Sequence, residues 1–111
     1  MAIDIRKYLF DIFTSIEMIK SHLANTKTIE EFETDFLKID AVERRLAIIG
    51  EALSKAVKLD PEIAITNKNE IIRLRHLLVH HYDASDEAVI WDIIQNNLPL
   101  LEQEVALLLK D

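Results

Sequence analysis

The scarcity of turn-forming residues is the feature that most restricts what this chain can fold into. Gly50 is its only glycine, and Pro61 and Pro99 are its only prolines, among 111 residues. Sheet proteins need turn residues about every ten positions, so this scarcity favours a few long helices. Half of the residues are hydrophobic and 30% are charged, which is typical of a globular chain. We therefore expect an all-α fold, formed by one helical domain over residues 1–111.

The first helix is predicted over about residues 3–24, where apolar residues recur at spacings of three and four. Phe10, Phe13 and Met18 lie outside this apolar stripe and widen the hydrophobic surface. A widened surface suggests contact with more than one neighbour, such as a second subunit.

Capping motifs place the next two helices. Thr28 followed by Glu31 fits a capping box, which would open a short helix that carries Phe32 and Phe36. Asp40 then precedes the apolar stripe of a third helix, whose members are Val42, Leu46, Ile49, Leu53, Ala56 and Val57.

The single glycine and the two prolines indicate how the helices of the second half of the chain are divided. Gly50 lies inside the third stripe, where glycine costs about 1 kcal/mol relative to alanine, so we expect another helix to approach closely there. After a connector with Pro61, a fourth helix is expected over about 67–82. The last helix would run from 86 towards 109, with a kink or a new turn at Pro99. Five helices in an up-and-down bundle is the simplest packing.

Charge and composition restrict the possible partners. A net charge of −7 argues mildly against general nucleic-acid binding but leaves room for a local basic site. The absence of cysteine removes disulfides and thiolate metal sites and suits a reducing cytoplasm. The longest apolar run, 105–109, is far too short to span a bilayer, and no signal peptide is readable at the N-terminus. We expect a soluble, cytoplasmic protein without a membrane partner.

The predicted fourth helix carries five basic or imidazole side chains among its aliphatic residues, namely Arg73, Arg75, His76, His80 and His81. On a regular helix Arg73, His76 and His80 fall within about 60° of each other. Arg75 and Tyr82 share one line, roughly 140° from His80. Arg75 and His80 of one straight helix therefore cannot easily act on the same phosphate. Either the helix distorts near its C-terminal end, or two chains pool these groups in a shared cleft, which we favour.

Two plainer interpretations of these residues remain open. Each could be an ordinary basic side chain that neutralises an acidic bundle. His76 and His80 also have the i, i+4 spacing of zinc ligands, with Asp83 or a remote carboxylate as the third ligand.

The same stretch resembles the Arg-x4-His-x-Tyr signature of HepT-type HEPN proteins, with Arg75, His80 and Tyr82 at the three signature positions. These proteins are the toxin halves of toxin–antitoxin pairs whose antitoxin is a minimal nucleotidyltransferase. The resemblance extends in order along most of the chain, through residues 40–52, 61–63, 89–92 and 98–99.

The resemblance implies a helical homodimer whose motif lines the cleft between protomers, and a metal-independent endoribonuclease activity that needs no cofactor. It makes Arg75 and His80 the catalytic pair and Tyr82 an auxiliary residue, which is also the acceptor when the antitoxin transfers AMP and silences the toxin. Arg73, His76 and His81 would be accessory residues of the cleft. His76 stands where the family commonly has a small polar residue, and His81 where it often has glycine.

Two functions from different classes follow from this sequence. The first is a ribonuclease toxin that acts on RNA and is neutralised by a nucleotidyltransferase antitoxin through Tyr82. The second is a non-catalytic helical module that binds nucleotide, or a partner nucleotidyltransferase, in the same basic cleft. The net charge of −7 and the presence of His76 favour this second reading somewhat.

Overall fold

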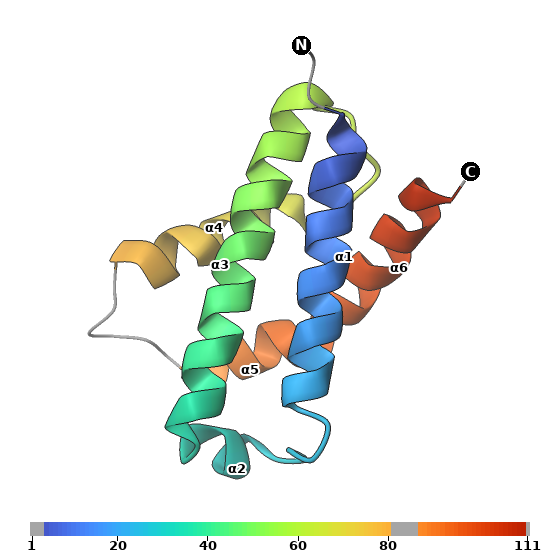
Figure 1. Cartoon of the computed structure of the whole chain (residues 1–111). Helices are drawn as coiled ribbons and strands as arrows, with labels where there is room; N and C mark the ends of the chain where they lie inside the picture. The colour runs from blue at the N-terminus through green and yellow to red at the C-terminus, as the bar shows by residue number, and fades with distance from the viewer. Residues whose placement is uncertain (1–3, 81–86, 111) are drawn as a thin grey trace.

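The computed structural model describes residues 4–80 and 87–110, and it describes no side chain from 76 to 80. These residues form six α-helices and no strand, which confirms the all-α prediction: α1 (Ile5–His22), α2 (Ile29–Glu33), α3 (Phe36–Leu59), α4 (Lys68–His80), α5 (Glu87–Asn96) and α6 (Leu98–Leu109). The long helices α1 and α3 lie side by side and run in opposite directions, while α4 and α5 cross them obliquely (Figure 1).

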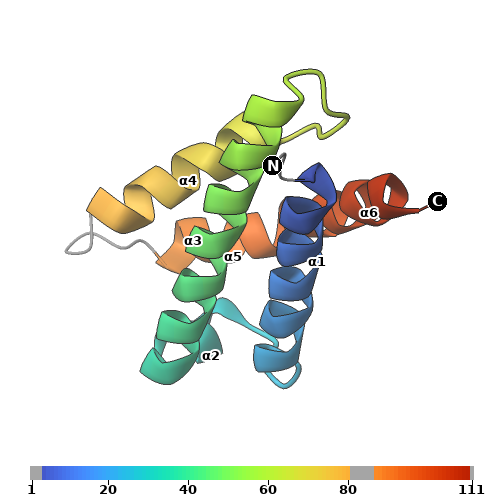
Figure 2. The ribbon, with the colours of Figure 1, turned by 45° about the horizontal axis from the view of Figure 1, so that its top comes forward.

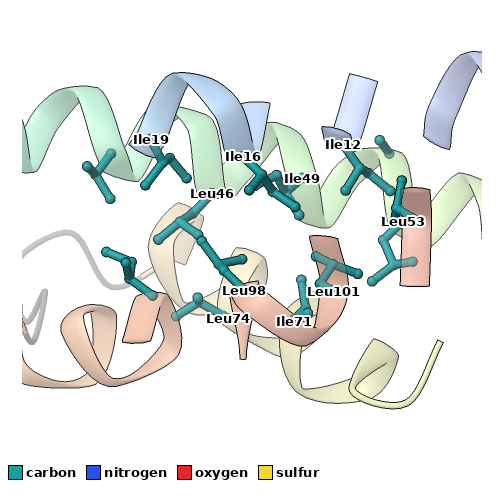
Figure 3. Packing of buried hydrophobic residues seen from close by; sticks show 14 of the residues in the cluster. Ile12, Ile16, Ile19, Leu46, Ile49, Leu53, Ile71, Leu74, Leu98 and Leu101 are labelled. Carbon is teal, nitrogen blue, oxygen red and sulfur yellow. The ribbon is translucent and has the colours of Figure 1, made fainter. Parts of the chain in front are cut away.

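The core is a mainly aliphatic cluster to which all six helices contribute, and Figure 3 shows members from α1, α3, α4 and α6. Its fully buried members recur at helical spacing, as the sequence predicts, and include Ile12, Ile16, Ile19, Leu46, Ile49, Leu53, Ile71 and Leu101. Burying each such side chain stabilises the fold by about 1.5–3 kcal/mol relative to leaving it exposed. This cluster fixes α4 against the α1–α3 pair.

The first helix agrees with its prediction and begins at a side-chain cap. The carboxylate of Asp4 accepts a hydrogen bond from the backbone N–H of Arg6 at 2.9 Å. On the outer side of α1, Phe10 is 62% exposed and Met18 is 38% exposed, as expected for apolar surface beyond the core stripe. Phe13 differs from the prediction, because it is partly buried and packs against the core.

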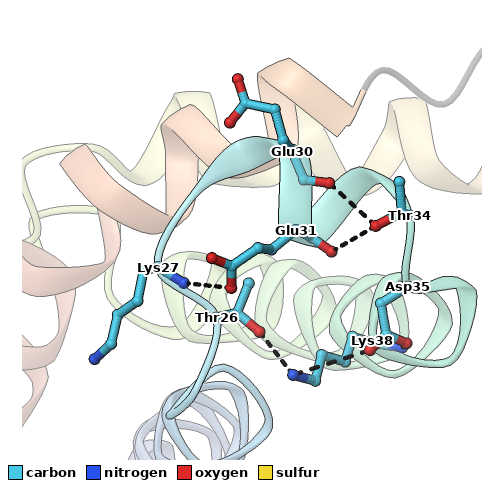
Figure 4. A network of polar contacts seen from close by, with 7 residues as sticks. All are labelled: Thr26, Lys27, Glu30, Glu31, Thr34, Asp35 and Lys38. Carbon is cyan, nitrogen blue, oxygen red and sulfur yellow. Dashed lines mark hydrogen bonds and ion pairs between the residues drawn. The ribbon is translucent and has the colours of Figure 1, made fainter.

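The junction between α2 and α3 differs from the prediction. One half of the predicted capping box is present, since Glu31 N–H donates to Thr28 Oγ1 at 3.2 Å. The Glu31 carboxylate accepts a hydrogen bond from Lys27 N–H, one residue before the N-cap (Figure 4). Phe32 is fully buried, but Phe36 belongs to α3 rather than to the short helix and is 76% exposed.

The third helix also begins earlier than predicted. Asp35, not Asp40, is its N-cap, and its side chain accepts a hydrogen bond from Lys38 N–H at 3.1 Å. Lys38 Nζ in turn donates to Thr26 Oγ1 at 2.7 Å, which ties the start of α3 to the segment after α1 (Figure 4). Because Asp35 caps the helix first, Asp40 lies inside it as an exposed residue.

The predicted last helix is divided in two. α5 ends at Asn96, and α6 begins at Leu98 with Pro99 in its first turn, where the missing N–H has no helical partner to lose. The new turn expected near Pro99 is therefore confirmed, and it adds a sixth helix. None of the described helices is long and apolar enough to cross a membrane.

Candidate functional site

Gly50 is the point at which α4 comes closest to α3. A Cβ added to Gly50 would lie 2.8 Å from Arg75 Cγ and would overlap Arg75 Cβ. It would also lie 3.4 Å from the carbonyl oxygen of Ile71. This is the close helix approach that the sequence predicts for Gly50, and Figure 2 shows α4 crossing α3. The glycine therefore positions Arg75 of the predicted catalytic pair.

An ion pair holds the Arg75 side chain beside α3. Arg75 Nη2 lies 2.5 Å from Glu51 Oε2, and the two side chains are 37% and 44% exposed. Lys55 Nζ is 3.5 Å from the other oxygen of Glu51, so one carboxylate serves two cations. Ion pairs this exposed are worth at most about 1 kcal/mol, so Glu51 orients the guanidinium more than it stabilises the fold.

Arg75 opens into a groove of about 320 Å³ formed by α1, α3 and α4. We name it the α1–α3 groove, and its charged lining is Lys7, Asp11, Arg44, Glu51, Lys55 and Arg75. Four cations and two carboxylates leave a local excess of two positive charges, in a chain whose net charge is −7. This is the kind of local basic site that the acidic composition leaves room for.

The cations of the groove are held in different ways. Lys7 Nζ pairs with Asp11 at 3.0 Å and lies 5.3 Å from the centre of the Tyr8 ring. Lys55 Nζ, from the other long helix, lies 5.8 Å from the centre of the same ring. Arg44 is exposed and forms no ion pair within residues 4–75 and 87–110. Two ammonium groups therefore lie near the ring of Tyr8, and each also has a carboxylate partner. Arg44 is a third cation of the groove and has no carboxylate partner in that range.

Glu43, the residue before Arg44 on α3, is an acidic residue in an unusual environment. Burial raises the pKa of Glu43, and the nearby carboxylates of Asp40 and Glu87 raise it further. Oxygen Oε1 of Glu43 is buried and has no hydrogen-bond partner among the described side chains and backbone. Glu43 does not line the groove.

The structure places part of the predicted site and is silent on the rest. Arg75 lines the groove, and Arg73 is exposed on the same helix without lining it. His76 and His80 belong to α4, but their side chains are not described. The predicted residues His81 and Tyr82, and Asp83 of the zinc alternative, lie outside the described residues.

The course of α4 bears on the choice between a distorted helix and a shared cleft. The helix runs without interruption from Lys68 to His80. The backbone positions of Arg75 and His80 are therefore separated by about 140° around the axis. Within these residues α4 has no break that would bring the two positions onto one line.

Sequence reasoning missed most of the groove. From the sequence we expect salt bridges for Arg44, Arg45 and Glu51. Glu51 forms one with the motif arginine itself, whereas neither arginine forms an ion pair within residues 4–75 and 87–110. Arg44, Glu51 and Lys55 follow each other at seven- and four-residue spacing, which places them on one face of α3. That pattern is visible in the sequence, but nothing in it shows that Lys7 and Tyr8 of α1 complete the same groove.

Comparisons with known proteins support the family that the sequence resembles. Residues 12–108 match the model of the family described as ribonuclease HepT-like. A provisionally named RNase of Methanocaldococcus jannaschii is 35% identical over 97% of this chain and 89% of its own length. A protein of Thermococcus cleftensis, provisionally named ribonuclease HepT, is 35% identical over 87% of this chain and 88% of its own.

A second provisionally named RNase of Methanocaldococcus jannaschii is 32% identical over 92% of this chain and 94% of its own length. No solved structure matches the chain with significance. The family model covers all of α3 and α4, including Gly50, Glu51 and Arg75. The chain therefore belongs to the HepT-like ribonuclease family.

Proposed function

We propose that this protein is a metal-independent endoribonuclease whose active site lies in a cleft between two copies of the chain. The observation that carries the proposal is Arg75, held by Glu51 in a groove with excess positive charge, in a member of a ribonuclease family. Arg75 and His80 form the catalytic pair, and Tyr82 assists them. Arg73, His76 and His81 lie around the cleft as accessory residues.

The residue types fit cleavage of RNA by its own 2′-hydroxyl. The hydroxyl attacks the adjacent phosphorus, so the protein has only to move protons and stabilise charge. An ordinary histidine has a pKa of about 6.5, so His80 can accept the hydroxyl proton or supply one to the leaving 5′-oxygen near neutral pH. Arg75 stays cationic and can bind two non-bridging oxygens as their charge grows. The products are a 2′,3′-cyclic phosphate and a 5′-hydroxyl.

The course of α4 supports a division of the catalytic pair between two chains. One continuous helix separates the Arg75 and His80 positions by about 140°, which two facing copies can resolve by contributing one group each. The exposed Phe10 and Met18 on α1 offer apolar surface for such an assembly.

We further propose that the protein is the toxin of a toxin–antitoxin system. In a minimal nucleotidyltransferase antitoxin, the Tyr82 hydroxyl loses its proton and its oxygen attacks the α-phosphorus of ATP, which transfers AMP to Tyr82 and releases pyrophosphate. The added nucleotide brings bulk and negative charge to the place where RNA phosphate binds, which silences the enzyme by steric and electrostatic exclusion.

The alternative function is a non-catalytic module that uses the same residues only to hold a nucleotide or a partner nucleotidyltransferase. The excess of acidic residues over the whole chain is the observation in its favour.

Purified protein incubated with RNA in the presence of EDTA decides between these functions. We expect cleavage to persist in EDTA, and Arg75→Ala and His80→Ala each to reduce it by at least about 100-fold without unfolding the protein. Lys58→Ala, an exposed cation at the end of α3 outside the groove, is the matched control and should cleave like the wild type. Unchanged cleavage by both site variants would contradict the catalytic assignment. Cleavage that stops in EDTA would contradict metal independence.

A further inference from the structure

The α1–α3 groove has cations that the catalytic assignment does not use. Arg75 is assigned to the reacting phosphate, but Lys7, Arg44 and Lys55 lie in the same groove and the motif does not include them. From these positions we propose that the α1–α3 groove binds the phosphodiester backbone of single-stranded RNA next to the phosphate held by Arg75. The inference rests on the proposed function, because it names how that substrate is held.

The geometry suits an extended anion. Arg44 and Lys55 stand at opposite ends of the groove on α3, about 16 Å apart along the helix axis. Glu51, with its bound Arg75, lies between them. A chain of phosphates laid along this face would therefore meet Arg44, then the guanidinium of Arg75, then Lys55. A single phosphate would use only part of it.

The electrostatics point to the same class of ligand. Lys7 and Lys55 come from different helices, yet both ammonium groups lie within 6 Å of the centre of the Tyr8 ring, at 5.3 and 5.8 Å. Attraction to the ring partly offsets their mutual repulsion, and a phosphate between them would offset it further. Among the four cations of the groove, Arg44 is the one that has no carboxylate partner within residues 4–75 and 87–110. The two carboxylates of the groove therefore neutralise only part of its positive charge, and an anionic ligand could neutralise the rest.

Single-stranded RNA fits better than a duplex. The groove, of about 320 Å³, has Arg44, Glu51 with its bound Arg75, and Lys55 along one face of α3, which suits the backbone of a single strand. Non-specific single-strand sites combine a basic groove with aromatic side chains, and Tyr8 provides one aromatic ring here.

Binding and cleavage are measured separately to test the proposal. The binding probe is a short labelled single-stranded RNA with every 2′-hydroxyl methylated, which cannot be cleaved because it lacks the nucleophile. We expect Arg44→Ala, and the double variant Lys7→Ala with Lys55→Ala, to bind it about threefold to tenfold more weakly and with a shallower dependence on salt. Lys7→Arg with Lys55→Arg should restore binding, since it keeps both charges.

Arg45→Ala is the matched control. Arg45 is the next residue on α3, carries the same charge and does not line the groove, so its loss should leave binding unchanged. In cleavage assays Arg44→Ala should raise KM by a similar factor and change kcat less than about twofold, whereas Arg75→Ala should lower kcat.

Two results would overturn the inference. One is equal binding by the Arg44 and Arg45 variants. The other is competition by poly-glutamate as strong as that by unlabelled RNA of the same length, which would assign the groove to an acidic protein segment. Failure of the proposed function looks different: the wild type would cleave no RNA, while the binding comparison between variants would still give its own answer.

Discussion

At the scale of single residues, Gly50 links the packing of the fold to the placement of Arg75. Glycine inside an exposed helix costs about 1 kcal/mol relative to alanine, so Gly50→Ala would stabilise α3 in isolation. In the folded chain the new Cβ would overlap Arg75 Cβ, on a helix that Ile71 and Leu74 fix in the core. The overlap outweighs the propensity because neither backbone can move away without opening the core.

We therefore expect Gly50→Ala to lower the free energy of unfolding by about 1–3 kcal/mol and to reduce RNA cleavage by displacing Arg75. The measurement is urea denaturation followed by circular dichroism. Ser54→Ala, one turn further along α3, is the control and should change stability by less than about 0.5 kcal/mol. A Gly50→Ala protein more stable than the wild type would contradict the close approach of α3 and α4.

Glu43 gives a second prediction at this scale. Burial and the neighbouring carboxylates raise its pKa, so the folded state holds the proton more tightly than the unfolded state does. The stability that this provides is fully present below the ordinary glutamate pKa and is lost as the pH rises through the raised value. Above the raised pKa, where Glu43 is ionised, its buried carboxylate therefore opposes folding.

The neutral variant Glu43→Gln should raise the melting temperature at pH 7, and this gain should shrink as the pH falls through the raised pKa and be absent below the ordinary value of 4.5. Thermal melts at the two pH values measure it. Glu33→Gln, which removes an exposed carboxylate of α2, controls for the change in net charge. An equal gain for Glu43→Gln at both pH values would contradict a raised pKa.

At the scale of elements, the start of α3 shows what local sequence signals can and cannot decide. Asp35 and Asp40 are both candidate N-caps, because aspartate is a preferred residue at the start of a helix. The capping-box rule selects Asp40, because Glu43 follows it by three. The structure selects Asp35 because Lys38 reaches back to Thr26 and joins the new helix to the segment after α1. That contact spans elements, so no window of local sequence contains it.

The two aspartates supply matched variants for the element that they delimit. Asp35→Ala removes the N-cap of α3 and should lower the free energy of unfolding by about 1 kcal/mol. Asp40→Ala replaces an exposed residue inside the helix and should change it by less than about 0.5 kcal/mol. Chemical denaturation of both variants tests the boundary. The reverse order of the two effects would place the helix start at Asp40.

Other elements were predictable because their signals are local or periodic. The apolar stripes of α1 and α3 follow from three- and four-residue spacing, and Pro99 marks the start of α6. The candidate site was predictable only in part. Arg75 lies in a motif on one helix, whereas the α1–α3 groove requires Lys7 and Tyr8 to meet residues about forty positions later. Packing of α1 on α3 brings them together, and sequence spacing does not record it.

At the scale of the whole molecule, the chain is acidic but the α1–α3 groove carries a local excess of positive charge. The net charge of −7 disfavours binding of RNA at most of the surface, while the α1–α3 groove has two more cations than carboxylates. Repulsion elsewhere would then direct a polyanion to the groove. An acidic ribonuclease of this design should be more selective for its groove than a basic one, because it has little non-specific affinity.

The remaining question at this scale is whether one chain or two form the active site. Arg75 and His80 occupy one uninterrupted helix at positions about 140° apart, so a site shared between copies takes Arg75 from one chain and His80 from the other. Inactive Arg75→Ala and inactive His80→Ala proteins should then restore activity when their subunits are exchanged. Half of the dimers would be mixed, and each would have one intact site of two, so recovery should approach about a quarter of wild-type activity. Each variant incubated with itself is the control. A site contained within one chain would show no recovery, because no chain in the mixture carries both groups.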